Sequence, residues 1–205
     1  MLTISGEPAA NRLQIPAAFQ ASTGGLIELQ GAGTEIAIAE GTGIASLYAV
    51  LGSDASLEIG PGCSLPSLIV HCAPGAKVKI GARCRAVGLI TLHAHEPELI
   101  TIGDDCLISD NLWATVSDMH SIIDIETGRR INPARPIHVG NHVWLGRNVT
   151  LLKGADIGAG SIIGTGAVVT GTIAGNALAA GSPAVVRREG VTWRHDLIPV
   201  TPAGV

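Results

Sequence analysis

Aliphatic residues recur every six positions through the second half of the chain and divide it into short, similar units. The anchors of this pattern are Val139, Leu145, Leu151, Ile157, Ile163 and Val169. Glycine follows most of the anchors, and a small or β-branched residue stands four positions after each one. An inward aliphatic side chain followed by glycine predicts a short strand and a bend, because glycine relieves crowding where the backbone turns. Three such hexads make one coil, and stacked coils are expected to pair as parallel strands.

The first half of the chain repeats with a longer period. Its anchors are Ile38, Ile59, Ile80 and Ile102, which follow one another at a nearly constant interval slightly longer than three hexads. This spacing predicts one larger coil per repeat, with the extra residues at one corner. Four positions after these anchors come Thr42, Cys63, Cys84 and Cys106. Three of the four cysteines are therefore expected in one inward column of small side chains, and the lack of CxxC or Cys/His spacing speaks against disulfides or a zinc site.

The six-residue pattern is interrupted once, between Ile108 and Val139. The intervening segment is polar, contains a Thr-Gly pair and ends in an Asn-Pro pair, as expected of a loop. Long loops on a rigid scaffold often carry function, so the chemistry is expected here. The chain is predicted to be one domain over residues 1–205, with coils over about 26–185, an active-site loop over about 115–137 and a C-terminal segment over about 186–205.

Composition agrees with a thin, repetitive core. Hydrophobic residues make up 46% of the 205 residues but aromatic residues only 2%, so aliphatic side chains must fill the interior. The net charge of −4 provides no basic footprint for nucleic acid. No apolar run is long enough for a membrane span, and the first residues show no signal-peptide pattern, so a cytoplasmic protein is expected.

Three motifs are specific enough to suggest a family. They are the loop run over residues 117–133, the stretch Val139-Gly140-Asn141-His142-Val143-Trp144-Leu145-Gly146 and the tail Ala179-Ala180-Gly181-Ser182-Pro183-Ala184-Val185-Val186-Arg187. Together with the hexads, they resemble the hexapeptide-repeat acyltransferase family, and within it the sugar and capsular-polysaccharide O-acetyltransferases, including those that act on sialic and polysialic acid. The resemblance implies an all-β fold, namely a left-handed parallel β-helix of triangular coils with one protruding loop.

The resemblance also implies an activity and an assembly. Acetyl-CoA is the expected co-substrate, a hydroxyl group of a saccharide or polysaccharide is the expected acceptor, and no metal is expected. Active sites of the family lie between the subunits of a homotrimer. The identity of the acceptor sugar does not follow from the sequence.

His120 in the loop matches the catalytic base of this family. An alcohol is a poor nucleophile at neutral pH, and an imidazole ionises in the range that suits proton abstraction. Asp118 is expected either to orient this imidazole, as in a catalytic triad, or to cap the loop. Trp144 matches the second family position, an outward wall for the pantetheine arm or the acceptor. Backbone N–H groups or Trp144 are the candidate donors to the oxyanion.

Small residues spaced by one coil predict a groove for acetyl-CoA. Gly146, Gly164 and Ser182 follow one another at intervals of three hexads, with Arg147, Thr165 and Pro183 beside them. A column of small outer residues leaves room for a thin ligand and exposes backbone amides to it. Arg187 and Arg188 follow the tail motif and, by the resemblance, are expected to meet phosphate groups of CoA, whose geometry suits a planar guanidinium.

Other interpretations stay open at this point. N-acetylation of a nucleotide-linked amino sugar is the alternative activity, and a non-catalytic binding module is another. A metal-dependent hydratase of the γ-carbonic anhydrase type is disfavoured, because that group carries an H-x₄-H pair whereas His138 and His142 form H-x₃-H. His93 and His95 share one strand face and could contact the acceptor, His142 is expected at the edge of the cleft, and Trp193 is expected to be a packing anchor.

Overall fold

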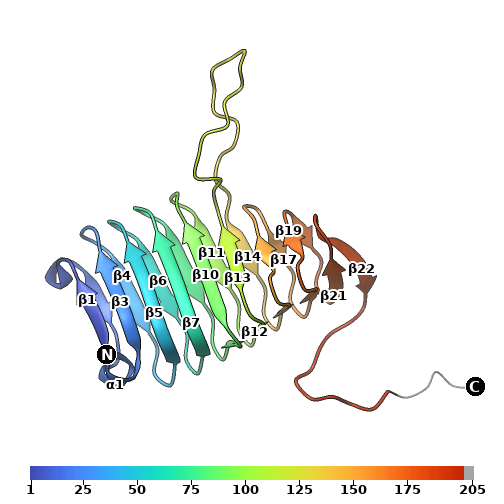
Figure 1. Cartoon of the computed structure of the whole chain (residues 1–205), viewed down its shortest axis with the longest axis horizontal. Coiled ribbons are helices and arrows are strands. Elements are labelled where there is room, and N and C mark those ends of the chain that lie inside the picture. Colours follow the sequence, from blue (N-terminus) through green and yellow to red (C-terminus); the bar gives the residue numbers. More distant parts are fainter. Residues whose placement is uncertain (201–205) are drawn as a thin grey trace, which may run out of the picture.

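The computed structural model shows a three-sided prism of stacked coils (Figure 1). It describes residues 1–200; residues 201–205, the end of the predicted C-terminal segment, lie outside the described residues. Each complete coil crosses three faces, and every strand except the last pairs in parallel with strands of the neighbouring coils. The predicted left-handed parallel β-helix is confirmed.

We number the faces in the order in which the chain crosses them within one coil. Face 1 consists of β2 (Arg12–Gln14), β4 (Glu35–Ile38), β6 (Ser56–Ile59), β8 (Lys77–Ile80), β11 (Leu99–Ile102), β14 (Ile137–Val139), β17 (Asp156–Ile157) and β20 (Thr172–Ile173). Face 2 consists of β9 (Arg85–Ala86), β12 (Leu107–Ile108), β15 (Trp144–Leu145), β18 (Ile162–Ile163) and β21 (Ala177–Ala180), with β22 (Val185–Glu189) closing the end in antiparallel pairing.

Face 3 contains the longest strands of the molecule. It consists of β1 (Leu2–Ser5), β3 (Gly24–Leu29), β5 (Gly43–Leu51), β7 (Ser64–Cys72), β10 (Leu89–Ala94), β13 (Leu112–Thr115), β16 (Thr150–Leu151) and β19 (Val168–Val169). β5 and β7 are long enough to run over face 2 as well. The first coil also contains the 3₁₀ helix η1 (Pro8–Ala10) and the helix α1 (Ala17–Ser22). No helix within residues 1–200 is long and apolar enough to cross a membrane.

The strand register confirms both predicted periods. On face 1 the anchors Ile38, Ile59, Ile80 and Ile102 stack directly on one another, as the longer period of the first half requires. In the second half, Val139 pairs with Ile157 and Leu145 pairs with Ile163, at the predicted interval of three hexads. These side chains are all buried, so the stacked aliphatic anchors form one continuous core along the prism.

The predicted column of small inward side chains is also confirmed. Cys63, Cys84 and Cys106 are buried on successive coils, and each thiol donates a hydrogen bond to a glycine carbonyl of the next coil. Thr42 begins this ladder, since its hydroxyl donates to a glycine carbonyl at 2.6 Å. All four cysteines are free, and burial raises the pKa of Cys72 to about 12. These thiols therefore act as small packing groups that also satisfy backbone acceptors.

The coils differ from the prediction at both ends. They begin at Leu2 rather than near residue 26, because β1 pairs in parallel with β3. The last coil is shorter than three hexads, since Ile173 rather than Gly175 stacks directly on Ile157. The corner before β20 consists of Thr170 and Gly171 alone, whereas the corner before β17 is twice as long. Ile173 is therefore a face-1 anchor, although the hexad pattern assigned it to the small inward position.

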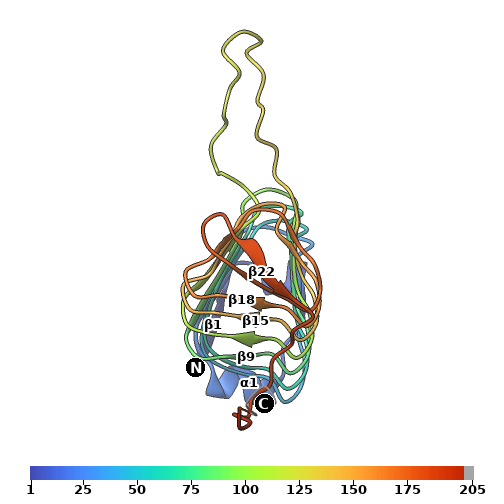
Figure 2. The same cartoon turned by 90° about the vertical axis from the view of Figure 1, so that its right-hand side faces the viewer.

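Residues 116–136 leave the prism between β13 and β14 as a single loop, in agreement with the predicted range (Figure 1). The edge from which they leave separates face 3 from face 1, and we call it the loop corner. The coil resumes in register after the loop, because Ile137 pairs with Ile100. Figure 2 shows the loop rising from this edge, with β9, β15 and β18 crossing the side of the prism away from it.

Candidate functional site

The loop is a narrow hairpin with a defined turn. Ile123 and Arg130 form an antiparallel bridge between its two arms. Gly128 closes the turn with a backbone hydrogen bond to Asp124 and has a φ of 65°, which lies in the left-handed region that favours glycine. The loop is therefore a structured element rather than an open connection.

A hollow of about 380 Å³ lies between the base of the loop and the end of β10. Its lining residues are His95, Glu96, Ser117, Met119, His120, Ser121 and Arg130. His95 and Glu96 come from the coil before the loop, and the others come from the loop itself. The predicted catalytic residue His120 therefore faces a hollow with walls from two successive coils.

Glu96 ties the loop to the prism. Its carboxylate accepts two hydrogen bonds from the Arg130 guanidinium, at 2.8 and 2.6 Å, and one from the Ser117 hydroxyl at 2.5 Å. The bonds from Arg130, and then the bond from Ser117, lower the pKa of Glu96 to about 2. A bidentate pair of a guanidinium and a carboxylate accepts one relative orientation, so it fixes the loop against the end of β10.

Asn132 is the buried centre of the hydrogen bonds at the loop base. Its amide N–H group donates to the carbonyl oxygen of His120 at 2.8 Å and to the carboxylate of Asp118 at 2.7 Å. Its amide oxygen accepts the N–H of Ile122 at 2.8 Å. Met119 has a φ of 62°, an uncommon conformation for a residue other than glycine, so the backbone bends sharply just before His120. The backbone of His120 is thus held from both sides.

Asp118 holds the loop rather than the imidazole of His120. Its carboxylate accepts hydrogen bonds from the Lys153 ammonium and from Asn132, which together lower its pKa. Lys153 lies at the loop corner of the next coil, so this ion pair joins the loop to the coil that follows. Within residues 1–200, no hydrogen bond joins Asp118 to the His120 ring. Of the two roles predicted for Asp118, the structure therefore shows the loop-capping one.

Trp144 lies on the opposite side of the prism from His120. It begins β15 on face 2, whereas His120 stands at the loop corner between face 3 and face 1 (Figure 2). The Trp144 side chain is 38% exposed and its indole N–H donates to the Ser109 hydroxyl at 3.4 Å, so its predicted outward orientation is confirmed. The structure does not bring His120 and Trp144 together within one chain.

Trp193 is the packing anchor that the sequence predicted. It is 5% exposed and stacks on His142, with ring centroids 4.4 Å apart and planes inclined by 10°. Its indole N–H donates to the backbone carbonyl of His142 at 2.8 Å. The C-terminal segment is thereby fixed to the prism. His142 is partly covered by Trp193, although the sequence placed it at an open cleft edge.

The predicted column of small residues stands at the corner between face 2 and face 3. Gly146 stacks on Gly164, where a Cβ atom on Gly146 would come within 2.7 Å of the Thr165 nitrogen. Gly164 stacks on Ala180 rather than on Ser182, because the last coil is shorter than the hexad rule assumes. The column is therefore Gly146, Gly164 and Ala180, and Ser182 lies just beyond its end.

Three arginines accompany this column. Arg147 follows Gly146 and forms an ion pair with Asp110, with 3.4 Å between the charged atoms. Arg187 and Arg188 lie in β22, which pairs with β21, and both side chains are exposed. Their predicted contact with CoA phosphates stays a prediction.

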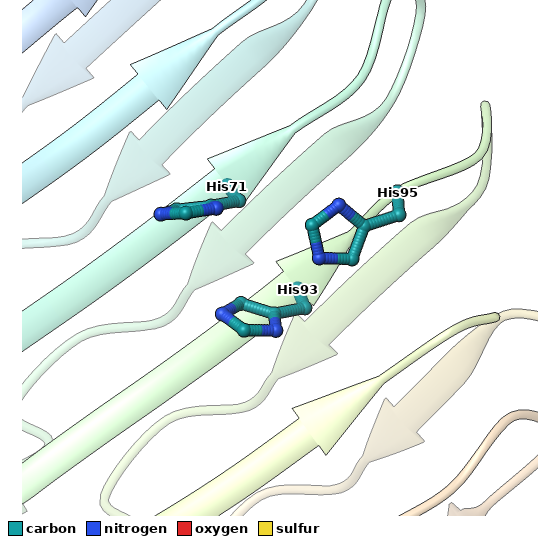
Figure 3. A group of neighbouring side chains, drawn as sticks. All are labelled: His71, His93 and His95. Carbon is teal, nitrogen blue, oxygen red and sulfur yellow. The ribbon is translucent and has the colours of Figure 1, made fainter. Parts of the chain in front are cut away.

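The sequence did not reveal that His71 joins His93 and His95 (Figure 3). His71 of β7 pairs with His93 of β10, and the two rings stack with centroids 4.9 Å apart. The ring of His95 lies 4.7 Å from His93 and 5.8 Å from His71. Burial, and then the neighbouring imidazoles, lower the pKa of His93 to about 4, and burial lowers that of His95. The coil period could have found this cluster, since the interval from His71 to His93 equals that from Ile80 to Ile102.

Comparison with known proteins agrees with this architecture. The family described as bacterial transferase hexapeptide (six repeats) matches residues 136–171. Among solved structures, the polySia-specific acetyltransferase NeuO is 26% identical, with 95% of this chain and 85% of its own covered and a TM-score of 0.78. The polysialic acid O-acetyltransferase OatWY is 27% identical, with 98% of this chain and 95% of its own covered and a TM-score of 0.75. No curated protein sequence matches.

The matched family segment covers the regular three-hexad coils, and the likeness to the two solved structures extends over nearly the whole chain. The chain therefore carries the bacterial transferase hexapeptide repeat over residues 136–171, and these likenesses support an acyltransferase, as its sequence motifs indicated.

Proposed function

We propose that this protein transfers an acetyl group from acetyl-CoA to a hydroxyl group of a saccharide or polysaccharide, with His120 as the general base. The observation that carries the proposal is the position of His120 on the rim of the loop-corner hollow, in a chain that is similar to acetyltransferases over nearly its whole length. The Glu96–Arg130 pair and Asn132 hold the loop in place, so the imidazole projects from a well-positioned backbone. Positioning of this kind is a large part of catalysis by proton transfer.

The proposed reaction is a direct transfer. The His120 imidazole accepts the proton of the sugar hydroxyl while the hydroxyl oxygen bonds to the carbonyl carbon of the thioester. The tetrahedral intermediate then collapses, the C–S bond breaks, and the protonated imidazole returns its proton to the departing thiolate of CoA. Backbone N–H groups or the Trp144 indole are the proposed donors to the intermediate oxyanion. All four cysteines are buried, so none is proposed as a nucleophile.

The site is proposed to form between two subunits of a homotrimer. His120 and Trp144 lie on opposite sides of one prism, so they can share a site only when two chains meet. The loop also exposes several isoleucine side chains that its own chain does not cover. They are Ile122, Ile123, Ile125 and Ile131, with exposed fractions of 53%, 47%, 97% and 60%. Clustered exposed apolar side chains favour contact with another protein surface, and a neighbouring subunit would supply it.

Acetyl-CoA is proposed to lie along the column of small residues of the second subunit. Gly146, Gly164 and Ala180 stack on successive coils, and their small size is proposed to let a thin pantetheine arm pass along the outer edge of the prism. Trp144 and Thr165 flank this path. Arg147, Arg187, Arg188 and the nearby Ser182 are the proposed contacts for the phosphate groups.

A thiol-release assay tests the activity across a panel of acceptors. Polysialic acid comes first, because both similar structures are described as polysialic acid or polySia enzymes. Free sialic acid, neutral oligosaccharides and nucleotide-linked amino sugars complete the panel. We expect CoA release with a hydroxyl acceptor and an alkali-labile ester product. Release only with amino sugars, with an alkali-stable amide as product, would replace O-acetylation by the alternative N-acetylation, and failure to bind acetyl-CoA would overturn the proposal. The cytoplasmic location stays a prediction.

A further inference from the structure

We propose that His71, His93 and His95 form a binding site for a divalent transition metal ion, with Zn²⁺ as the preferred ion. Each imidazole offers one ring nitrogen, and the three nitrogens lie within 4.8 Å of one another. Figure 3 shows the three rings gathered beside the ends of β7 and β10. None of the three residues belongs to the machinery proposed for acetyl transfer.

The sheet itself brings the three rings together. His71 and His93 are paired residues on adjacent strands, and His95 follows His93 by two positions, which places it on the same face of the chain. The residues between and beside them, Cys72 and Ala94, are buried, so the imidazoles project outward from face 3. Because backbone pairing fixes the Cα positions, side-chain rotation alone has to adjust the site.

The geometry is close to that of a bound ion. A Zn–N distance of about 2.0–2.1 Å in a tetrahedral site requires the ligating nitrogens to be about 3.3 Å apart. Nitrogens that already lie within 4.8 Å of one another would need to approach by at most about 1.5 Å. Rotations about the side-chain bonds of His71 and His95 can provide this movement without a change in the sheet.

Two nitrogens of the cluster lack partners. Nδ1 of His93 and Nε2 of His95 are buried and have no hydrogen-bond partner within residues 1–200. Buried polar atoms nearly always have a hydrogen-bond partner. A metal ion bound to the lone pairs of these nitrogens would supply the partner that they lack. An all-nitrogen donor set favours Zn²⁺ and its neighbours in the first transition row over Ca²⁺ or Mg²⁺, which prefer oxygen.

His71 and His93 occupy paired positions on two adjacent strands of face 3, and the same position continues on the strands before and after them. In the preceding coil the position of His71 is occupied by Val50, and in the following coil the position of His93 is occupied by Thr115. Both neighbours are β-branched residues that suit a strand. They supply the replacements His71→Val and His93→Thr, which remove a ligand while keeping residue types that this column already accepts.

The site also adjoins the hollow at the loop corner, because His95 lines that hollow together with His120. Three protein ligands leave one position of a tetrahedral ion open to water or another oxygen. The family resemblance implied no metal. No short motif marks this site, because two of the ligands share one strand face and the third comes from the coil before it.

The test begins with tag-free protein that has been stripped with a chelator and dialysed. Titration with Co²⁺ is followed by visible absorption, and titration with Zn²⁺ by calorimetry. We expect one ion per chain, a tetrahedral-type Co²⁺ spectrum and its loss when Zn²⁺ is added. Neither readout depends on acetyl transfer, so failure of the proposed activity would leave this result unaffected.

Ligand variants and a matched control decide where the ion binds. His71→Val and His93→Thr should each weaken Zn²⁺ binding by at least the factor of about 10–100 found when groups that merely support metal ligands are removed. His138→Ala should bind as the wild type does, because His138 is exposed on face 1 and contacts Thr101. His95→Gln removes the third ligand, which lies just beyond the end of β10, and should also weaken Zn²⁺ binding. No saturable binding, an octahedral spectrum, or equal affinity in the ligand variants and the wild type would overturn the proposal.

Discussion

The loop corner and face 2 are built on the same repeat but differ in how they carry functional side chains. At the loop corner the chain leaves the prism and is held by ion pairs, Glu96 with Arg130 and Asp118 with Lys153. On face 2 the strands around Trp144 are short and regular, and the outward side chains that stack with Trp144 are Leu107, Ile162 and Leu178. The loop corner thus carries the proposed base, and face 2 borders the proposed path for the cofactor.

This difference follows from what the repeat constrains. Each coil must place aliphatic side chains inward, whereas its outward positions and corner lengths are free to vary. One chain therefore carries the two halves of the proposed site on opposite sides, and a second chain is needed to oppose them. Variants of each half can show whether the halves have separate tasks and whether they meet between subunits.

The largest expected effect is on the base itself. His120→Ala should lower turnover by about 10²–10⁴, equivalent to roughly 3–5 kcal/mol, because loop residues 116–136 carry no second imidazole that could take its place. Binding of CoA, measured by calorimetry, should be preserved, since the proposed cofactor path lies on face 2. Near-wild-type turnover in a thiol-release assay would show that another group abstracts the proton.

The second prediction concerns the pairing of the halves. Trimers of His120→Ala and of Trp144→Ala are dissociated, mixed in equal amounts and reassembled. If each site takes His120 from one subunit and Trp144 from its neighbour, every mixed trimer contains one intact site. Measured at acetyl-CoA well below its KM, where both parent variants are weak, activity should then return to about a quarter of the wild-type value. Activity no higher than the mean of the two parent variants would place both residues in one chain's site or exclude Trp144 from it.

A smaller effect is expected from Trp144 alone. Trp144→Ala should raise the KM for acetyl-CoA about tenfold, because an exposed indole wall would be lost from the proposed pantetheine path. Trp113→Ala is the matched control: its side chain is 36% exposed, close to the 38% of Trp144, but it lies on face 3. Equal changes in both variants would indicate a general loss of stability rather than a lost contact.

The smallest effect concerns the attachment of the loop. The folded pKa of Glu96 is lowered from 4.5 to about 2, so its pairing stabilises the loop above pH 4.5 and this contribution is lost as the pH falls toward 2. Exchange of loop backbone amides, relative to amides of the prism, should therefore accelerate across that interval in the wild type. In Glu96→Gln the loop should already exchange faster at neutral pH and should show little further acceleration. A wild-type loop whose relative exchange does not change with pH would contradict the role of the pair.

Much of the scaffold could be predicted because the buried aliphatic residues recur at regular intervals in the sequence. The spacing of Ile38, Ile59 and Ile80 located face 1, and the six-residue anchors located the regular coils. The start at Leu2 was missed because the first coil has a helix, α1, between β2 and β3 instead of a strand with its glycine. The short last coil was missed because the six-residue pattern placed Ile173 at the position four residues after an anchor, whereas Ile173 is itself an anchor. Counting three full hexads therefore put Ser182 in the column, where the structure has Ala180.

The residues of the proposed site could be named one at a time from the sequence, but their contacts with one another could not. His120 and Trp144 could be identified from local motifs, and the outward orientation of Trp144 followed from the thin interior. The bond between Glu96 and Arg130 joins residues 34 positions apart, and the contact between Asp118 and Lys153 joins residues 35 positions apart. No periodic pattern reports such contacts, because exposed polar residues are not constrained by the repeat.

The sequence by itself determined the coil, its two periods, the core and the place of the single interruption, since each depends on which side chains must avoid water. Only the tertiary structure decided which polar groups meet: the carboxylate that holds the loop, the amide that holds the backbone of His120, and the three imidazoles of His71, His93 and His95. The physical reason is that corner lengths set how coils stack, and stacking sets which distant residues become neighbours. The shortening of one corner was enough to replace Ser182 by Ala180 in the column.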